Sequence, residues 1–209
     1  RFFEANKCLQ FNYYLHEYPI GRVISFVLER VRHKIHSVGW QHGPAAWRKL
    51  VSFMDPKEVA SEAGVGERIS IPMEVFAEDE ESVKMYQHAG FVNVRRMERI
   101  YRLDYLDSVA PKKEDSIALV VPGLHDGPQL LAAITDWHVV NKHDQVFFKP
   151  HPSASERYLK ERSGLQDIKI TREPIDKLLG HVGIVFVTYS SVGIEAAMLG
   201  IETVVVDIP

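Results

Sequence analysis

The feature that most constrains the fold is a regular alternation of short apolar runs and helical patterns along the second half of the chain. Strands are expected where these runs fall, at 117–121, 145–149, 168–171, 184–187 and 203–207. Each run is nearly continuous in apolar residues, which is typical of strands covered on both faces. Strands that alternate with helices imply right-handed crossovers and a parallel sheet. The sequence therefore predicts an α/β domain here.

The first half shows the same pattern more weakly. Apolar spacing predicts helices over 21–34, 56–63 and 78–88, and strands over 35–40 and 69–75 and from residue 91. The segment 104–116 is polar, charged and Pro-containing, and is interpreted as a linker. The predicted organisation is two Rossmann-like halves, 1–103 and 117–209. Both are expected to be truncated, because the chain starts without Met and stops directly after an apolar run.

Composition narrows the functional class. The chain of 209 residues is 45% hydrophobic and 25% charged, which suits a globular protein with a sizeable core. A net charge of -3 argues against a protein that coats nucleic acid. The single cysteine, Cys8, excludes an intrachain disulfide and a cysteine-based metal site. No apolar run approaches the ~18 residues of a membrane span. We expect a cytoplasmic protein with no metal site.

The turn after the apolar run 183–187 carries the first candidate site residues, Ser190 and Ser191. Ligands of open α/β sheets bind outside the carboxyl ends of the strands. Serines cap helix N-termini, where free N–H groups attract anions. Gly193 would let a ligand approach the backbone, and Glu195 could accept hydrogen bonds from a ribose diol. The alternative is an ordinary serine cap with a glutamate that complements the helix dipole.

His151 follows another predicted strand and lies between Pro150 and Pro152. Residues before proline avoid the helical region, so the histidine is held in extended backbone. Its imidazole could donate a hydrogen bond to a phosphate or to a leaving oxygen. The alternative is a loop histidine without a role. Together with the two serines, His151 predicts one pocket for a phosphorylated ligand.

Three further residues are weaker candidates. His42 follows the strand expected at 35–40 and could act as a general base that faces the second half across a cleft. Glu17 precedes the first predicted helix and could serve as a base or a nucleophile. Gly123 belongs to a loop with two glycines that would suit close approach of a ligand. A turn histidine, a solvated glutamate and a plain β-to-α turn are the respective alternatives.

These motifs resemble those of bacterial glycosyltransferases of the two-Rossmann-domain (GT-B) type that assemble capsule and lipopolysaccharide. The most similar are enzymes that use CMP-activated Kdo or sialic acid, which carry a His-Pro and a Ser-Ser motif. His151-Pro152 and Ser190-Ser191 match these motifs, and Glu195 matches the acidic residue that follows the serines. Residues 39–43 resemble a motif in the first half of these enzymes. Residues 97–106 resemble the segment where their chain crosses between the two halves.

The resemblance implies a role for each match. His151, Ser190 and Ser191 would hold the CMP phosphate, and Glu195 would hold the ribose. No cofactor or metal is implied beyond the nucleotide-sugar donor. The acceptor would be a glycan or a lipid-linked glycan, with Glu17 or His42 as the base. Peripheral association with the inner face of the cell membrane stays open, because lipid-linked acceptors lie there.

Three alternatives remain beside this hypothesis. CDP-glycerol or CDP-ribitol phosphotransferases share Tyr-Ser-Ser, but this chain has Thr188 and Pro44 where they have Asp and Thr. A non-catalytic nucleotide-sugar-binding module is the second alternative. Residues 81–91 also resemble the end of an acyl-CoA N-acetyltransferase, but no pyrophosphate loop rich in Gly and Arg accompanies them.

Overall fold

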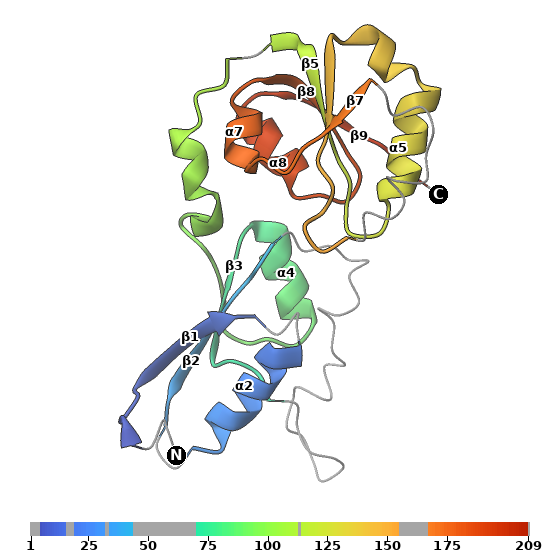
Figure 1. Cartoon of the computed structure of the whole chain (residues 1–209). Coiled ribbons are helices and arrows are strands. Elements are labelled where there is room, and N and C mark those ends of the chain that lie inside the picture. The colour runs from blue at the N-terminus through green and yellow to red at the C-terminus, as the bar shows by residue number, and fades with distance from the viewer. Residues whose placement is uncertain are drawn as a thin grey trace. The chain divides into compact units, whose positions relative to one another are not determined.

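The chain forms two compact units, Arg1–Ile100 and Tyr101–Pro209 (Figure 1). This computed structural model describes residues 5–15, 19–31, 34–43, 70–112, 114–154 and 167–208. Each unit has its own parallel sheet with helices in the connections. The predicted α/β class with two Rossmann-like halves is therefore confirmed.

The first unit contains a four-stranded parallel sheet whose strands follow one another in sequence order. Its elements are β1 (Gln10–Tyr14), α2 (Pro19–Glu29), β2 (His36–Trp40), β3 (Glu74–Ala77), α4 (Glu80–His88) and β4 (Val94–Arg96). Right-handed crossovers that advance in one direction place their helices on one face of a sheet. Figure 1 shows α2 and α4 on the same side of this sheet.

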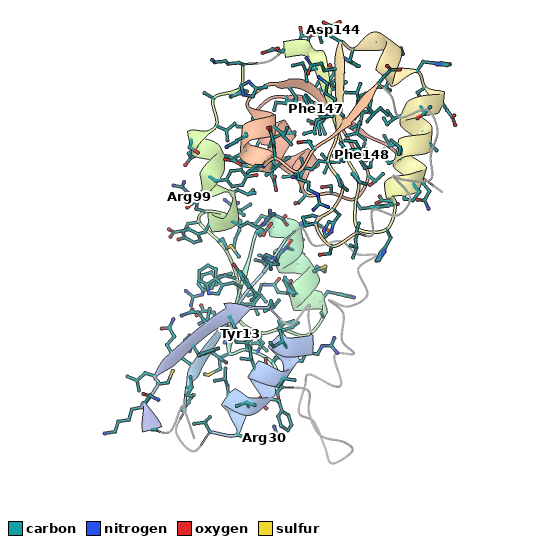
Figure 2. All side chains as sticks on the ribbon, viewed as in Figure 1. Tyr13, Arg30, Arg99, Asp144, Phe147 and Phe148 are labelled. Atoms are coloured by element: carbon teal, nitrogen blue, oxygen red, sulfur yellow. The ribbon has the colours of Figure 1, made fainter. Side chains whose placement is uncertain are left out.

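Apolar contacts and one buried hydrogen bond fix α2 against the sheet. Tyr13, Leu28 and Ile35 form a buried cluster between β1, α2 and the start of β2. The Tyr13 hydroxyl (labelled in Figure 2) lies 2.6 Å from the Ser25 hydroxyl, which itself donates to the Gly21 carbonyl. The polar atom of Tyr13 is thus satisfied inside the core, as burial requires.

Helix α4 begins and ends where its sequence dictates. The Asp79 carboxylate accepts a 2.7 Å hydrogen bond from the Ser82 N–H, and Glu80 and Glu81 add negative charge to the first turn. Gly90 follows with a φ of 93°, a backbone conformation that favours glycine. The predicted helix over 78–88 is confirmed from Glu80 onward.

Several boundaries in the first unit differ from the predictions. Strand β1 was not predicted, because its polar and apolar residues mix. The strand expected at 69–75 starts only at Glu74, since Pro72 lacks the N–H that a ladder needs. Helix α2 runs from Pro19 to Glu29 instead of 21–34. Strand β4 starts at Val94, because Phe91 turns inward and packs edge-on against Tyr86. The helix predicted over 56–63 lies outside the described residues.

The second unit contains a five-stranded parallel sheet in the order β7-β6-β5-β8-β9. Its strands are β5 (Glu114–Val121), β6 (Gln145–Phe148), β7 (Ile168–Ile170), β8 (Val182–Val187) and β9 (Glu202–Val205). Its helices are η2 (Tyr101–Ser108), α5 (Gly127–Asp136), η3 (Val139–Lys142), α7 (Ile175–Leu179) and α8 (Val192–Met198). The chain advances from β5 to β7 and then returns to the other side of β5, so the strand order reverses between β5 and β8.

This reversal places helices on both faces of the sheet. Figure 1 shows α5 on one side and α7 and α8 on the other. Phe147 and Phe148, labelled in Figure 2, are neighbours on β6 and therefore point to opposite faces. Phe148 is fully buried in the cluster that contains Leu130 and Ile134 of α5. Burial on both faces explains the nearly continuous apolar runs of β5 and β8.

The segment predicted as a linker, 104–116, contains regular structure. Residues 104–108 belong to η2, which buries Leu103 and Leu106. Strand β5 already begins at Glu114, three residues before the apolar run that predicted it. Because Glu114 and Asp115 are exposed at the start of the strand, their polarity hid this extension.

Gly183 marks the closest approach of β5 and β8. The register between these strands shifts between Glu114 and Ala118. A Cβ on Gly183 would lie 2.6 Å from the Asp115 Cα and 2.7 Å from the Glu114 carbonyl oxygen. Both are backbone atoms that cannot turn away, so only glycine fits.

We predict that Gly183→Ala lowers the free energy of unfolding of the second unit by about 2–3 kcal/mol, because the strands must separate to admit a methyl group. Urea unfolding followed by circular dichroism measures this change. Gly180→Ala is the matched control: Gly180 has a φ of -68° and its Cβ would lie 3.2 Å from the Lys177 carbonyl oxygen, so its effect should be smaller, about 1 kcal/mol. Equal losses in both variants would contradict the close approach.

Candidate functional site at the carboxyl edge of the second sheet

The predicted binding residues of the second half lie on one edge of its sheet. His151 follows β6, Gly123 follows β5, and Ser190 and Ser191 follow β8. All these strands are parallel, so their carboxyl ends share an edge. Neighbouring strands lie about 4.8 Å apart, which places the loops after β6 and β8 about 10 Å apart, with the β5 loop between them. The fold thus places the loops that carry these residues along one edge of the sheet.

A hydrogen bond joins the two loops at the place where the strand order reverses. The Gly123 N–H donates to the Thr188 hydroxyl oxygen at 3.1 Å, and Thr188 is buried. This bond joins the loop after β5 to the loop after β8. Such a reversal is the place where open α/β sheets hold their ligands.

The tautomer of His151 follows from its contacts. Its Nδ1 accepts a 3.1 Å hydrogen bond from the Ser153 N–H. A neutral imidazole that accepts at Nδ1 carries its proton at Nε2. The half-buried ring can therefore donate from Nε2 to an anion. Pro152 is exposed beside it.

Two cationic residues, Lys149 and Arg172, follow β6 and β7 at the same edge of the sheet as His151. Lys149, at the end of β6, donates from Nζ to the Glu173 carbonyl oxygen at 2.5 Å. Burial lowers the pKa of Lys149, and the nearby positive charge of Arg172 lowers it further. Cationic residues that follow strands at this edge suit an anion such as a phosphate. Lys149 was part of the predicted motif, but sequence reasoning gave it no role.

The two serines behave differently from each other. The Ser190 hydroxyl accepts a long, 3.4 Å hydrogen bond from the Val192 N–H, and this residue is half-buried. Ser191 occupies the cap position of α8, but its hydroxyl makes no cap hydrogen bond and donates to Glu195 Oε1 at 3.2 Å. Helix α8 has only seven residues. Capping therefore falls to Ser190, and Ser191 is oriented by Glu195.

Glu195 of α8 is buried, and its carboxylate links this helix to η2. Its Oε2 accepts a 2.6 Å hydrogen bond from the Tyr105 hydroxyl, and its Oε1 accepts from Ser191. Burial raises the pKa of Tyr105, and the hydrogen bond to Glu195 raises it further. Both oxygens of Glu195 already have protein partners, so its role toward a ribose stays a prediction.

Gly193 has a packing role in this structure. A Cβ at this position would lie 2.8 Å from the Val187 Cγ2 atom. Glycine thus lets α8 lie directly on β8. Its predicted role in ligand approach is not tested by this contact.

Asp126 lies at the same edge of the sheet, and the sequence did not single it out. It directly precedes α5 in the Gly123 loop, and both of its carboxylate oxygens are buried without a hydrogen-bond partner in the described structure. The loop was identified by its glycines, and the acidic residue inside it was the signal that could have revealed this feature.

His42, the candidate of the first half that the structure describes, follows a strand of the other sheet. The ring of His42, after β2, lies 4.5 Å from the ring of Tyr14. The neighbouring Gln41 anchors this loop, since its amide donates to Ser82 at 3.2 Å and accepts from the Glu78 N–H at 2.8 Å. Glu17 lies outside the described residues. Both residues remain predicted bases.

Among the described residues, two kinds of feature are absent. These residues contain no group of three or more His, Cys, Asp or Glu side chains that could hold a metal ion. None of the helices traced in the structure combines the length and the apolar character that crossing a bilayer demands.

Comparison with known proteins supports the fold. No family model matches the chain, and no curated protein matches it. A structure of UDP-N-acetylglucosamine 2-epimerase from Rickettsia bellii superposes over 97% of this chain, with a TM-score of 0.59 and 13% identity. The match covers 57% of the epimerase chain, so the present chain spans little more than half of that length. The chain has the fold of two Rossmann-like halves found in the GT-B type.

Two structures of the wall teichoic acid polymerase TagF with CDPG match more weakly. They cover 82% and 81% of this chain and 48% of their own, at 12% identity. Their TM-scores are 0.47 and 0.45, which are too low to establish a shared fold.

We predict that Tyr105→Phe lowers the free energy of unfolding by about 1–2 kcal/mol, because Glu195 loses a charge-assisted hydrogen bond. The folded protein holds the Tyr105 proton more tightly than the unfolded chain does. The hydrogen bond therefore contributes to the free energy of unfolding below the unfolded-state pKa of 10.0, and this contribution is lost as the pH rises above that value.

Urea unfolding between pH 8 and pH 11 tests this prediction. The wild type should lose more stability than the variant above pH 10, so their difference should shrink there. Tyr189→Phe is the control, because Tyr189 is 77% exposed. A constant difference across the pH range would mean that the Tyr105 proton is not held by this contact.

Proposed function

We propose that the chain belongs to a glycosyltransferase that transfers a sugar from a CMP-activated, Kdo- or sialic-acid-like donor to a glycan or glycolipid of the cell surface. One observation supports this proposal most strongly. The Nε2 donor of His151, the cations Lys149 and Arg172, and the Ser190 hydroxyl lie along one sheet edge, beside the point where the strand order reverses.

The proposed chemistry is positioning with charge stabilisation. When the bond between the sugar and the CMP oxygen breaks, negative charge grows on the departing phosphate. His151 would donate from Nε2 to that oxygen, while Lys149 and Arg172 lower the electrostatic cost of the dianion. This arrangement needs no metal ion for donor binding, and the nucleotide-sugar itself is the only small molecule required.

The acceptor hydroxyl must lose a proton to a base, for which Glu17 and His42 remain the candidates. The acceptor would be a glycan or a lipid-linked glycan. A lipid-linked acceptor would bring the protein to the inner face of the cell membrane as a peripheral protein. Nucleic acid is not an expected partner.

A CDP-glycerol or CDP-ribitol phosphotransferase is the second candidate, because Tyr189-Ser190-Ser191 follows the motif of that group. Both reactions release CMP, so the two functions use the same nucleotide edge. They differ in the donor that supports transfer, and an assay with CMP-sialic acid, CMP-Kdo and CDP-glycerol separates them. Binding of CMP without transfer from any donor by the full-length protein would favour a non-catalytic binding module.

We predict that His151→Ala weakens CMP binding about tenfold or more, because a hydrogen bond to the phosphate is lost. The double change of Ser190→Ala with Ser191→Ala should do the same, and both variants should lose transfer activity. Calorimetry with CMP and with cytidine isolates the phosphate: cytidine affinity should change less than twofold.

His181→Ala is the matched control for this experiment. His181 is exposed and directly precedes β8, at the opposite, amino edge of the same sheet. Circular dichroism should show that all variants remain folded. Wild-type CMP affinity and full activity in the His151 and serine variants would remove the site assignment.

A further inference from the structure

Two carboxylates lie near the nucleotide edge of the second unit, and their surroundings differ. Glu195 has a hydrogen-bond donor at each oxygen, from Tyr105 and from Ser191. Asp126 has none at either oxygen in the described structure, although both oxygens are buried. One acid is therefore engaged by the protein itself, and the other is left with its full capacity to accept hydrogen bonds.

The position of Asp126 ties it to the point where the strand order reverses. A Cβ on Gly123 would lie 3.0 Å from Asp126 Oδ1 and 3.3 Å from Oδ2, so the carboxylate occupies the space beside Gly123. The N–H of that glycine donates to Thr188 in the loop after β8. The carboxylate thus stands next to the hydrogen bond that joins the loops after β5 and β8.

Helix capping does not account for Asp126. It occupies the residue before α5, but its side chain makes no cap hydrogen bond. Pro128, at the start of the helix, has no N–H to offer. A buried carboxylate without donors is unfavourable by itself, so its presence calls for an explanation such as a function.

We propose that Asp126 accepts hydrogen bonds from the ribose diol of the bound nucleotide, the role that the resemblance had given to Glu195. This inference rests on the proposed function, since it requires a nucleotide at this edge. A vicinal diol offers two adjacent O–H donors, which match the two oxygens of one carboxylate. The loop from Gly123 to Asp126 must shift on binding, because the oxygens are buried in the ligand-free protein.

Other ligand groups fit Asp126 less well. A phosphate oxygen is an acceptor and carries negative charge, so a carboxylate repels it. A metal ion would need further protein ligands, and the described residues provide no acidic or histidine cluster around Asp126. A neutral group with two hydrogen-bond donors satisfies the carboxylate without either difficulty.

The test compares CMP with 2′,3′-dideoxy-CMP, which keeps the base and phosphate but lacks the diol. Affinities are measured by calorimetry for the wild type and for Asp126→Asn. The wild type should bind CMP about tenfold or more tightly than the dideoxy probe, as expected for hydrogen bonds to a charged acceptor. The variant should bind the two probes within about threefold of each other.

Asp136→Asn is the matched control, because Asp136 is an exposed carboxylate at the other end of the same helix. It should keep the wild-type preference for the diol. Thermal unfolding without ligand provides an independent readout. Asp126→Asn should raise Tm, since it removes an unpaired buried charge while Asn remains a good residue to precede a helix. Asp126→Ser serves as a second neutral variant.

Each outcome decides the inference. An unchanged preference for the diol in Asp126→Asn and Asp126→Ser would overturn it, and so would a lowered Tm in both neutral variants. CMP binding that requires Mg²⁺ in the wild type and loses this requirement in Asp126→Asn would make Asp126 a metal ligand and overturn it as well. Tight CMP binding by the wild type without diol discrimination would reject this inference alone. Absence of CMP binding to the wild type would reject the proposed function together with it.

Discussion

The contact between β5 and β8 is the constraint on which the second unit depends. The two strands are neighbours in the sheet although β6 and β7 lie between them in sequence, so their pairing creates the reversal of strand order. Gly183 allows their backbones to approach at one end of the pair. The bond from the Gly123 N–H to the Thr188 hydroxyl joins the loops at the other end. Open α/β sheets bind their ligands at such a reversal, because there the connections after neighbouring strands leave to opposite faces of the sheet.

Electrostatics divide this edge into regions with different chemistry. Lys149 and Arg172 place two cationic groups on the side of β6 and β7, and His151 adds a donor at Nε2. The side of β8 offers hydroxyl groups, of which that of Ser191 is turned toward Glu195. Between them, Asp126 places a negative, hydrogen-bond-accepting group next to Gly123. A nucleotide has the same division, with an anionic phosphate and a ribose rich in donors.

The sequence predicted the second unit well, because its strands are buried on both faces and read as apolar runs. The edge residues followed from the same logic, since polar turns after such runs must share an edge of a parallel sheet. The first unit was harder to predict: β1 mixes polar and apolar residues, and Pro72 delays β3. Because the start of β5 and η2 also contain charged residues, this segment was wrongly predicted to be a linker.

The partners of individual side chains could not be predicted from sequence. The hydrogen bond between Tyr105 and Glu195 joins residues 90 positions apart, and no local sequence pattern predicts it. Asp126 lay in a loop noted for its glycines, but its lack of partners is a property of three-dimensional packing. Motifs thus locate an edge, whereas the choice between two acids for one role depends on contacts that only the folded chain reveals.

A crystal structure of the protein with CMP bound tests the central claim most directly. The account predicts that a phosphate oxygen lies about 3 Å from His151 Nε2, with the nucleotide lying across the loops after β6, β5 and β8. A nucleotide bound at the amino edge of the sheet, or on the first unit, would contradict it.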